Sequence, residues 1–196
     1  LDVDHQLDAR ALAFAEDAGL SFVRPHGLVA RAVALLGLGA YAGAADVLAE
    51  ADKLAVGIRD RHNIIDVKIV HAKLSLCRGD VDGAIEMTED VPRGITSGLA
   101  AELGATQALA CACAGQNSRS AELIQKLPKL SSLPDAAALV LATQAVAAAN
   151  ADDDALVVRY LREISDVGAV DALVIAQRAS SALIEALTRA DLQPEL

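Results

Sequence analysis

Residues Cys77–Glu86, CRGDVDGAIE, carry the signals of one helix ending and another beginning within a few residues. Gly79 can adopt the left-handed conformation that closes a helix, and Asp80 can cap the helix that follows. Two helices joined by so short a turn lie antiparallel, and they need small side chains where they come closest. Ala72 and Ala84, twelve residues apart, are suited to that role. The stretch therefore predicts a helical hairpin.

The same arrangement occurs in four places along the chain, which indicates a repeat. In the last copy Asn replaces Gly as the turn residue, because Asn is among the few other residues that adopt the left-handed conformation. Successive turn residues are 40, 36 and 35 positions apart, and the two small residues of each copy are always twelve apart. The turn residues are Gly39, Gly79, Gly115 and Asn150, and the small pairs are Ala32 with Ala44, Ala72 with Ala84, Ala108 with Ser120, and Thr143 with Ala155.

The composition favours helices over strands. Of the 196 residues 54% are hydrophobic, but only 2% are aromatic and none is Trp. Alanine supplies much of the apolar content, whereas strands prefer β-branched and aromatic residues. We therefore expect an all-α fold whose helices pack closely on small side chains.

Charge and cysteine content limit the setting of the protein. A net charge of −10 argues against nucleic-acid binding, which depends on clustered Lys and Arg. No apolar run approaches the roughly 18 residues of a membrane span. Three cysteines form no framework of pairs, so a reduced, cytoplasmic setting is expected. The chain begins at Leu1 and has its only Met at position 87, which indicates a piece of a longer protein.

No stretch has the composition of a linker, so the sequence predicts one domain over residues 1–196. Residues 1–24 would hold a partial N-terminal repeat helix, residues 25–165 four hairpins, and residues 168–190 a single C-terminal capping helix. The second helix of the first hairpin is expected to run from Tyr41 to about Arg61. A partly polar terminal helix would keep the end of such an array soluble.

The chain resembles the tetratricopeptide repeat superfamily over residues 25–164. The best match is the second hairpin, where Ala72, Gly79, Asp80, Ala84 and Ile85 fall on the small, turn and small positions of that repeat. This resemblance implies a right-handed superhelix, an α-solenoid. Leu and other aliphatic residues replace the larger rings common in the family. Long Leu- and Ala-rich units with an RGD turn are similar to the variant found in bacterial LuxR-type ATP-dependent transcription regulators, where the array is a sensor arm between an ATPase and a DNA-binding module.

Catalytic and metal-binding patterns are weak throughout the sequence. No Gly-Lys dipeptide exists, so a P-loop is excluded. Cys111 and Cys113 would point about 200° apart on a helix and cannot share a metal ion. Residues 152–154, three aspartates, lack the spacing of a calcium loop and are expected to begin a helix. We therefore expect no enzyme, no metal and no cofactor; Asp66 with Glu102 is the one acid pair to test otherwise.

The expected function is ligand binding by the first helices of the hairpins, which line the concave groove in this family. A protein partner or a small effector would bind there. The alternative is a scaffold that assembles a complex or a homodimer through its outer or end helices. Lys73 alone fits the basic pattern that clamps acidic peptide ends, so no such clamp is expected. The candidate groove residues are His26, Val29, Val33, Asp66, Ile69, Lys73, Glu102, Ala105, Leu109, Val140 and Gln144.

Overall fold

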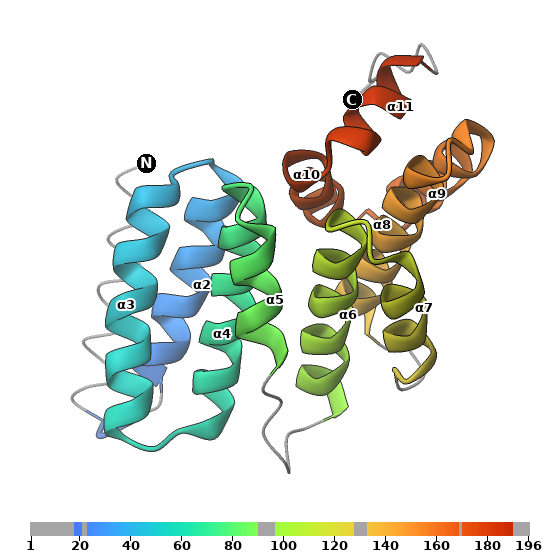
Figure 1. The fold of residues 1–196 in the computed structure, drawn as a ribbon. Coiled ribbons are helices and arrows are strands. Elements are labelled where there is room, and N and C mark those ends of the chain that lie inside the picture. Colours follow the sequence, from blue (N-terminus) through green and yellow to red (C-terminus); the bar gives the residue numbers. More distant parts are fainter. Residues whose placement is uncertain (1–17, 21–22, 90–96, 128–132, 169, 190–196) are drawn as a thin grey trace. The chain divides into compact units, whose positions relative to one another are not determined.

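A computed structural model describes residues 18–20, 23–89, 97–127, 133–168 and 170–189. Within these residues every regular element is an α-helix and no strand occurs, so the all-α prediction is confirmed (Figure 1). The described helices are α2 (Val23–Gly37), α3 (Tyr41–Gly57), α4 (Arg61–Cys77), α5 (Val81–Glu89), α6 (Ser97–Cys113), α7 (Asn117–Gln125), α8 (Pro134–Asn150), α9 (Asp154–Val167), α10 (Val170–Ala179) and α11 (Ser181–Arg189).

The chain divides into two compact units, residues 1–74 and 75–196. In the first unit α2 packs against α3, and Arg24 on α2 bonds Glu50 on α3 at 3.0 Å. In the second unit α5 packs on α6, α6 on α7 and α8, and α8 on α9. That these units form one domain and a right-handed superhelix stays a prediction. The N-terminal helix predicted over residues 1–24 lies largely outside the described residues.

The hairpin turns share one hydrogen-bond pattern. The left-handed residue donates its N–H to the carbonyl three residues earlier, and the next N–H donates to the carbonyl five before it, which is a Schellman turn. At Gly79 (φ 78°), the N–H bonds the Leu76 carbonyl at 3.0 Å, and the Asp80 N–H bonds the Ser75 carbonyl at 2.9 Å. Asp80 also caps α5, because its Oδ1 accepts the Gly83 N–H at 3.0 Å. The quoted stretch is therefore the turn that the sequence predicted.

Three of the predicted small pairs are buried. Full burial of both members is expected where helices pack closely on small side chains. Ser120 strengthens its own contact by donating its Oγ hydrogen to the Ala108 carbonyl at 2.8 Å. The exposed fraction is 0% for Ala32, Ala44, Ala72, Ala84 and Ala108 and 1% for Ser120.

The fourth turn differs from its prediction by two residues. Helix α8 continues through Asn150, and the left-handed residue is Asp152, with φ 55°. Asn150 instead uses its side-chain amide, which donates to the Ala112 carbonyl at 2.8 Å and to Asn117 Oδ1 at 3.0 Å. The left-handed residues of the four hairpin turns, Gly39, Gly79, Gly115 and Asp152, are therefore 40, 36 and 37 positions apart.

The same shift corrects the fourth small pair, because the pair lies seven residues before and five after the left-handed residue. Counted from Asp152, these positions are Ala145 and Val157, and both are 0% exposed. Ala155 is exposed. The prediction that Thr143 pairs with Ala155 is wrong, and the twelve-residue spacing is retained.

Helix α3 ends at Gly57 and does not continue to Arg61 as predicted. Arg59 adopts the left-handed conformation (φ 55°), and its N–H bonds the Val56 carbonyl at 3.1 Å. Asp60 then caps α4. Its Oδ1 accepts the N–H groups of His62 at 3.0 Å and Asn63 at 3.2 Å, and its Oδ2 accepts the Asn63 amide at 2.7 Å.

Replacing the capping residue Asp60 is expected to lower the unfolding free energy by an amount that depends on pH. Burial raises the pKa of Asp60, but hydrogen bonds from Asn63 and His62 outweigh that effect and lower it overall. Asp60→Ala is therefore expected to cost about 1 kcal/mol of unfolding free energy at neutral pH. Because the folded-state pKa is lowered, the part of this cost that depends on the charge is fully present above the unfolded pKa of about 3.9 and is lost as the pH falls through the folded value. Urea unfolding at pH 7 and at the lowest pH at which the chain stays folded measures it.

The control for this experiment is Asp52→Ala. Asp52 is exposed within α3, so its replacement is expected to change stability by no more than about 0.5 kcal/mol at either pH. An Asp60→Ala cost that stays equal at both pH values would contradict the charged cap.

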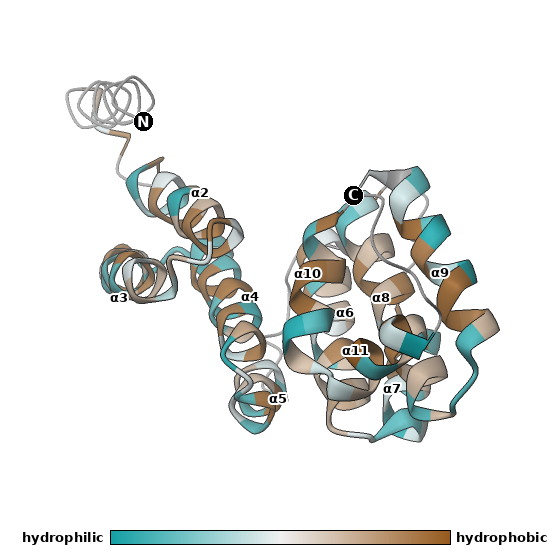
Figure 2. Cartoon of the chain, turned by 90° about the horizontal axis from the view of Figure 1, so that it is seen from above, coloured by the Kyte–Doolittle hydropathy of each residue, from teal (hydrophilic) through white to brown (hydrophobic). Residues whose placement is uncertain are grey.

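Helix α8 is the core of the second unit. It contacts α6, α9, α10 and α11, and most of its side chains are buried, as its nearly uniform apolar sequence between Ala136 and Ala149 requires. Figure 2 shows α8 among these neighbours with almost no strongly hydrophilic residue along its length.

The predicted single C-terminal helix is two helices separated at Ser180. The Ser180 Oγ accepts the Leu183 N–H at 3.2 Å, which caps α11. A Ser side chain that bonds the backbone in this way competes with helix continuation. The two helices contact α8 and α9, and α10 also contacts α6.

Candidate functional site

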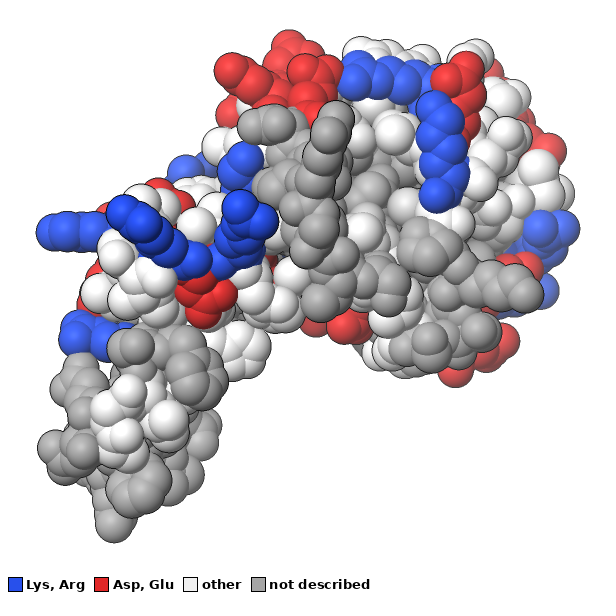
Figure 3. All heavy atoms as spheres, turned by 90° about the horizontal axis from the view of Figure 1, so that it is seen from below, with Lys and Arg blue, Asp and Glu red and all other residues white. Residues whose placement is uncertain are grey.

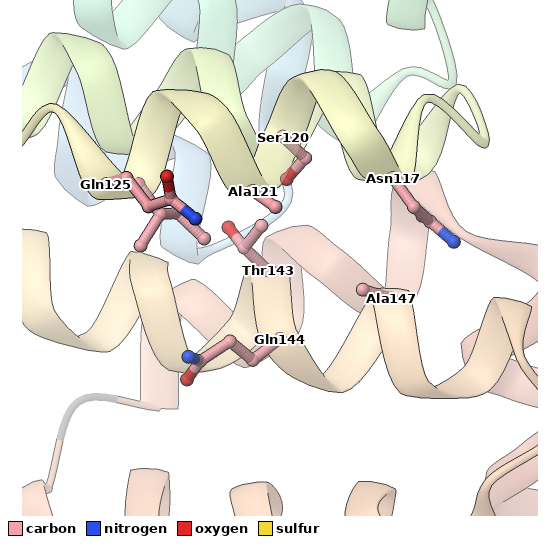
Figure 4. Close-up of a pocket in the computed structure, with 8 residues that line it drawn as sticks. Asn117, Ser120, Ala121, Gln125, Thr143, Gln144 and Ala147 are labelled. Atoms are coloured by element: carbon pink, nitrogen blue, oxygen red, sulfur yellow. The ribbon is translucent and has the colours of Figure 1, made fainter.

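A depression of about 290 Å³ lies between α7 and α8 (Figure 4). No charged side chain lines it. Its walls are amide and hydroxyl groups around small apolar residues, which is the composition of a site for an uncharged ligand that forms hydrogen bonds. The lining residues are Asn117, Ser120, Ala121, Ile124 and Gln125 from α7 and Thr143, Gln144 and Ala147 from α8.

The depression exists because α7 packs mainly on α6. Ser120 is the buried residue of α7, and its bond to the Ala108 carbonyl holds α7 against α6. On the side facing α8, Ala121 and Ala147 are too small to fill the remaining space. At one end, the bond between Asn150 and Asn117 joins the two helices.

The hydroxyl groups of the depression are already used within the protein. Ser120 donates to Ala108, and Thr143 donates its Oγ1 hydrogen to the Leu139 carbonyl at 2.7 Å. Figure 4 shows Gln125 on α7 and Gln144 on α8 at the same end of the depression. These two amides, one exposed and one half-buried, are the polar groups placed to meet a ligand.

The predicted groove residues of the first unit fall into two groups. His26 and Val33 are exposed, and Lys73 is half-buried. Asp66 lies 3.3 Å from His62 Nε2, one helical turn earlier. Val29 and Ile69 belong to the core, with 7% and 1% of their surfaces exposed.

In the second unit Leu109 and Ala105 are fully buried, Val140 is nearly so, and Glu102 is half-buried. Gln144 is the predicted residue that lines the depression. Its position follows from the two-residue shift of the fourth turn, which the sequence did not reveal. This shift rotates the predicted groove-lining face by about 200° around α8, so Gln144 lies on a different side of the helix from the predicted one. The positions equivalent to Val140 and Gln144 are therefore Ala142 and Val146.

The α7 residues of the depression were not predicted as site residues. One signal was present: α7 is nine residues long and its sequence, NSRSAELIQ, contains few large apolar residues. A second helix that buries so little surface cannot pack tightly on both of its neighbours.

Cys77 and Cys111 are buried, and Cys113 is half-buried. Burial raises the pKa of the Cys111 thiol and raises that of Cys113 to about 12. Both groups are therefore protonated at neutral pH, and a protonated thiol is a poor nucleophile and metal ligand.

The three aspartates at residues 152–154 are engaged in helix geometry and ion pairs. Asp153 caps α9 by accepting the Leu156 N–H at 3.0 Å. Arg189 on α11 bonds Asp154 at 2.9 Å and Asp152 at 3.2 Å, and its hydrogen bond lowers the pKa of Asp154. No group of three potential metal-binding side chains occurs in the described ranges.

The charged side chains of the face in Figure 3 are mixed in sign, with basic groups beside acidic or uncharged ones. None of the described helices is both long enough and apolar enough to cross a membrane. Comparison with protein-family models, curated proteins and solved structures gives no match.

Proposed function

We propose that this chain is a helical-repeat interaction module of a larger bacterial regulatory protein, similar to the arm of LuxR-type regulators, and that it binds a partner or small effector. The observation that carries the proposal is the uncharged depression between α7 and α8. Gln125 and Gln144 offer donors and acceptors beside the apolar Ala121 and Ala147. Such a surface suits a peptide backbone or another uncharged amide.

Capped dipeptides, acetylated at the amino end and amidated at the carboxyl end, are a direct probe of this site. We expect members of a panel with different side chains to shift amide signals of α7 and α8 in NMR titrations. Gln144→Ala is expected to weaken this binding at least tenfold, because it removes a side-chain amide that can both donate and accept hydrogen bonds. Gln177→Ala is the matched control, because Gln177 is also half-buried, on α10, and does not line the depression. Equal binding by both variants, or no binding across the panel, would refute the proposal.

A scaffold function is the second candidate, and it is favoured by exposed apolar side chains in the first unit. Leu38 is 76% exposed at the α2–α3 turn, and Val56 is 55% exposed near the end of α3. Self-association that is lost in Leu38→Asp and kept in Gln144→Ala, measured by analytical ultracentrifugation, would support a scaffold.

A further inference from the structure

The first helices of the repeat present one equivalent face, defined by the residues 13, 10 and 6 positions before each left-handed turn residue. We call it the first-helix face. In α2 this face is partly open, because His26 is exposed and Val33 is 42% exposed. In α6 and α8 its apolar members are at most 2% exposed; they are Ala105, Leu109, Leu139, Ala142 and Val146.

Helices α10 and α11 lie against this part of the second unit. Helix α10 contacts α6, α8 and α9, and α11 contacts α8, α9 and α10. In a repeat array each hairpin contacts only its neighbours. Helix α10 also contacts α6, which lies beyond the adjacent α8–α9 hairpin, and a helix that only extended the array would not reach it. Both views show α10 beside α6 and α8 (Figures 1 and 2).

The covering helices are amphipathic. On α10 the buried residues are Ala172, Leu173, Ile175 and Ala176, at the spacing of one helical side. On α11 Leu183 is fully buried, while its neighbour Ile184 is 50% exposed. An amphipathic helix with small and branched apolar residues therefore packs against α6 and α8.

Helix-ending residues bound and divide this pair, and the ion pairs of Arg189 add little to its attachment. Gly168, in the left-handed conformation (φ 70°), precedes α10, and Ser180 separates the helices. The ion pairs that Arg189 makes are exposed, with Asp152 85% exposed, and such pairs contribute little. Helices of ten and nine residues are not stable alone in water. Their folding thus depends on the face that they cover.

We propose that the first-helix face of α6 and α8 is a helix-binding surface, that this chain occupies it with its own α10–α11, and that an amphipathic helix of a partner binds there in exchange. This inference rests on the proposed function in taking the chain to be an interaction module. It concerns a different surface from the α7–α8 depression, and it gives the partner a chemistry: small and branched apolar residues on one side of a short helix.

Hydrogen exchange of the full chain tests whether the face opens. Amides of α10 and α11 are expected to exchange at least tenfold faster than those of α8, because the pair opens while α8 stays folded. Equal protection of α8, α10 and α11 would show that they unfold together, and it would overturn the inference.

A labelled peptide of residues 170–189 tests the exchange. The intact chain is expected to bind it weakly, because α10–α11 already occupies the face. Leu183→Asp should release the pair and bind the peptide at least tenfold more tightly. Ile184→Asp, the adjacent exposed position, should behave like the intact chain.

Two outcomes would overturn the inference: a folded Leu183→Asp chain without increased peptide binding, or a Leu183→Asp chain that loses its cooperative unfolding, which would make α10–α11 part of the core. Capped dipeptides are titrated into the same samples. If only the dipeptides fail to bind, the proposed function is refuted and this inference is not. If only the helical peptide fails to bind, this inference is refuted and the proposed function is not.

Discussion

Leu109→Ala is expected to lower the unfolding free energy by about 2–5 kcal/mol. Leu109 is fully buried on α6, which packs against α5, α7, α8 and α10, so the truncation leaves a cavity that surrounding helices cannot easily close. Urea denaturation followed by far-ultraviolet circular dichroism, which reports helix content, measures the change.

Ile184→Ala is the matched control, because Ile184 is half exposed on α11 and its truncation should cost no more than about 0.5 kcal/mol. A similar small cost for Leu109→Ala would place Leu109 at a solvent-filled groove, which is where the sequence alone predicted it.

Ala145→Leu is expected to destabilise the protein by about 1–3 kcal/mol. Ala145 and Val157 are the fully buried pair of the fourth hairpin, so a larger side chain at residue 145 must push α8 and α9 apart. Thermal unfolding by differential scanning calorimetry measures the loss.

Ala155→Leu separates the two possible registers of this hairpin. Ala155 is exposed, so its replacement is expected to change stability by no more than about 0.5 kcal/mol. The opposite order of the two effects would restore the pairing of Thr143 with Ala155.

The sequence predicts those turns that contain glycine and misplaces those that do not. Gly39, Gly79 and Gly115 mark their turns directly, because glycine adopts the left-handed conformation without a steric penalty. Arg59 and Asp152 adopt it at a cost of about 1–2 kcal/mol that the surrounding hydrogen bonds must offset. The local sequence does not reveal those hydrogen bonds, so it favours Asn150 over Asp152 as the turn residue.

The position of the C-terminal helices could not be predicted for a related reason. The stripe of Leu173, Ala176, Ala179 and Leu183 fits a capping helix and a helix packed against both α6 and α8 equally well. The choice depends on contacts with α6, more than fifty residues away along the chain. Gln144 lines the depression between α7 and α8, but its prediction as a groove residue assumed that Asn150 is the turn residue, whereas the left-handed residue is Asp152.

The side-chain amide of Asn150 has a mechanical consequence. It bonds the end of α6 through Ala112 and the start of α7 through Asn117, so it joins the turn of the third hairpin to the last turn of α8. A pulling force applied along the second unit would have to break this amide bridge before the two hairpins could separate. The third and fourth hairpins should therefore separate at a higher load than they would without this bridge.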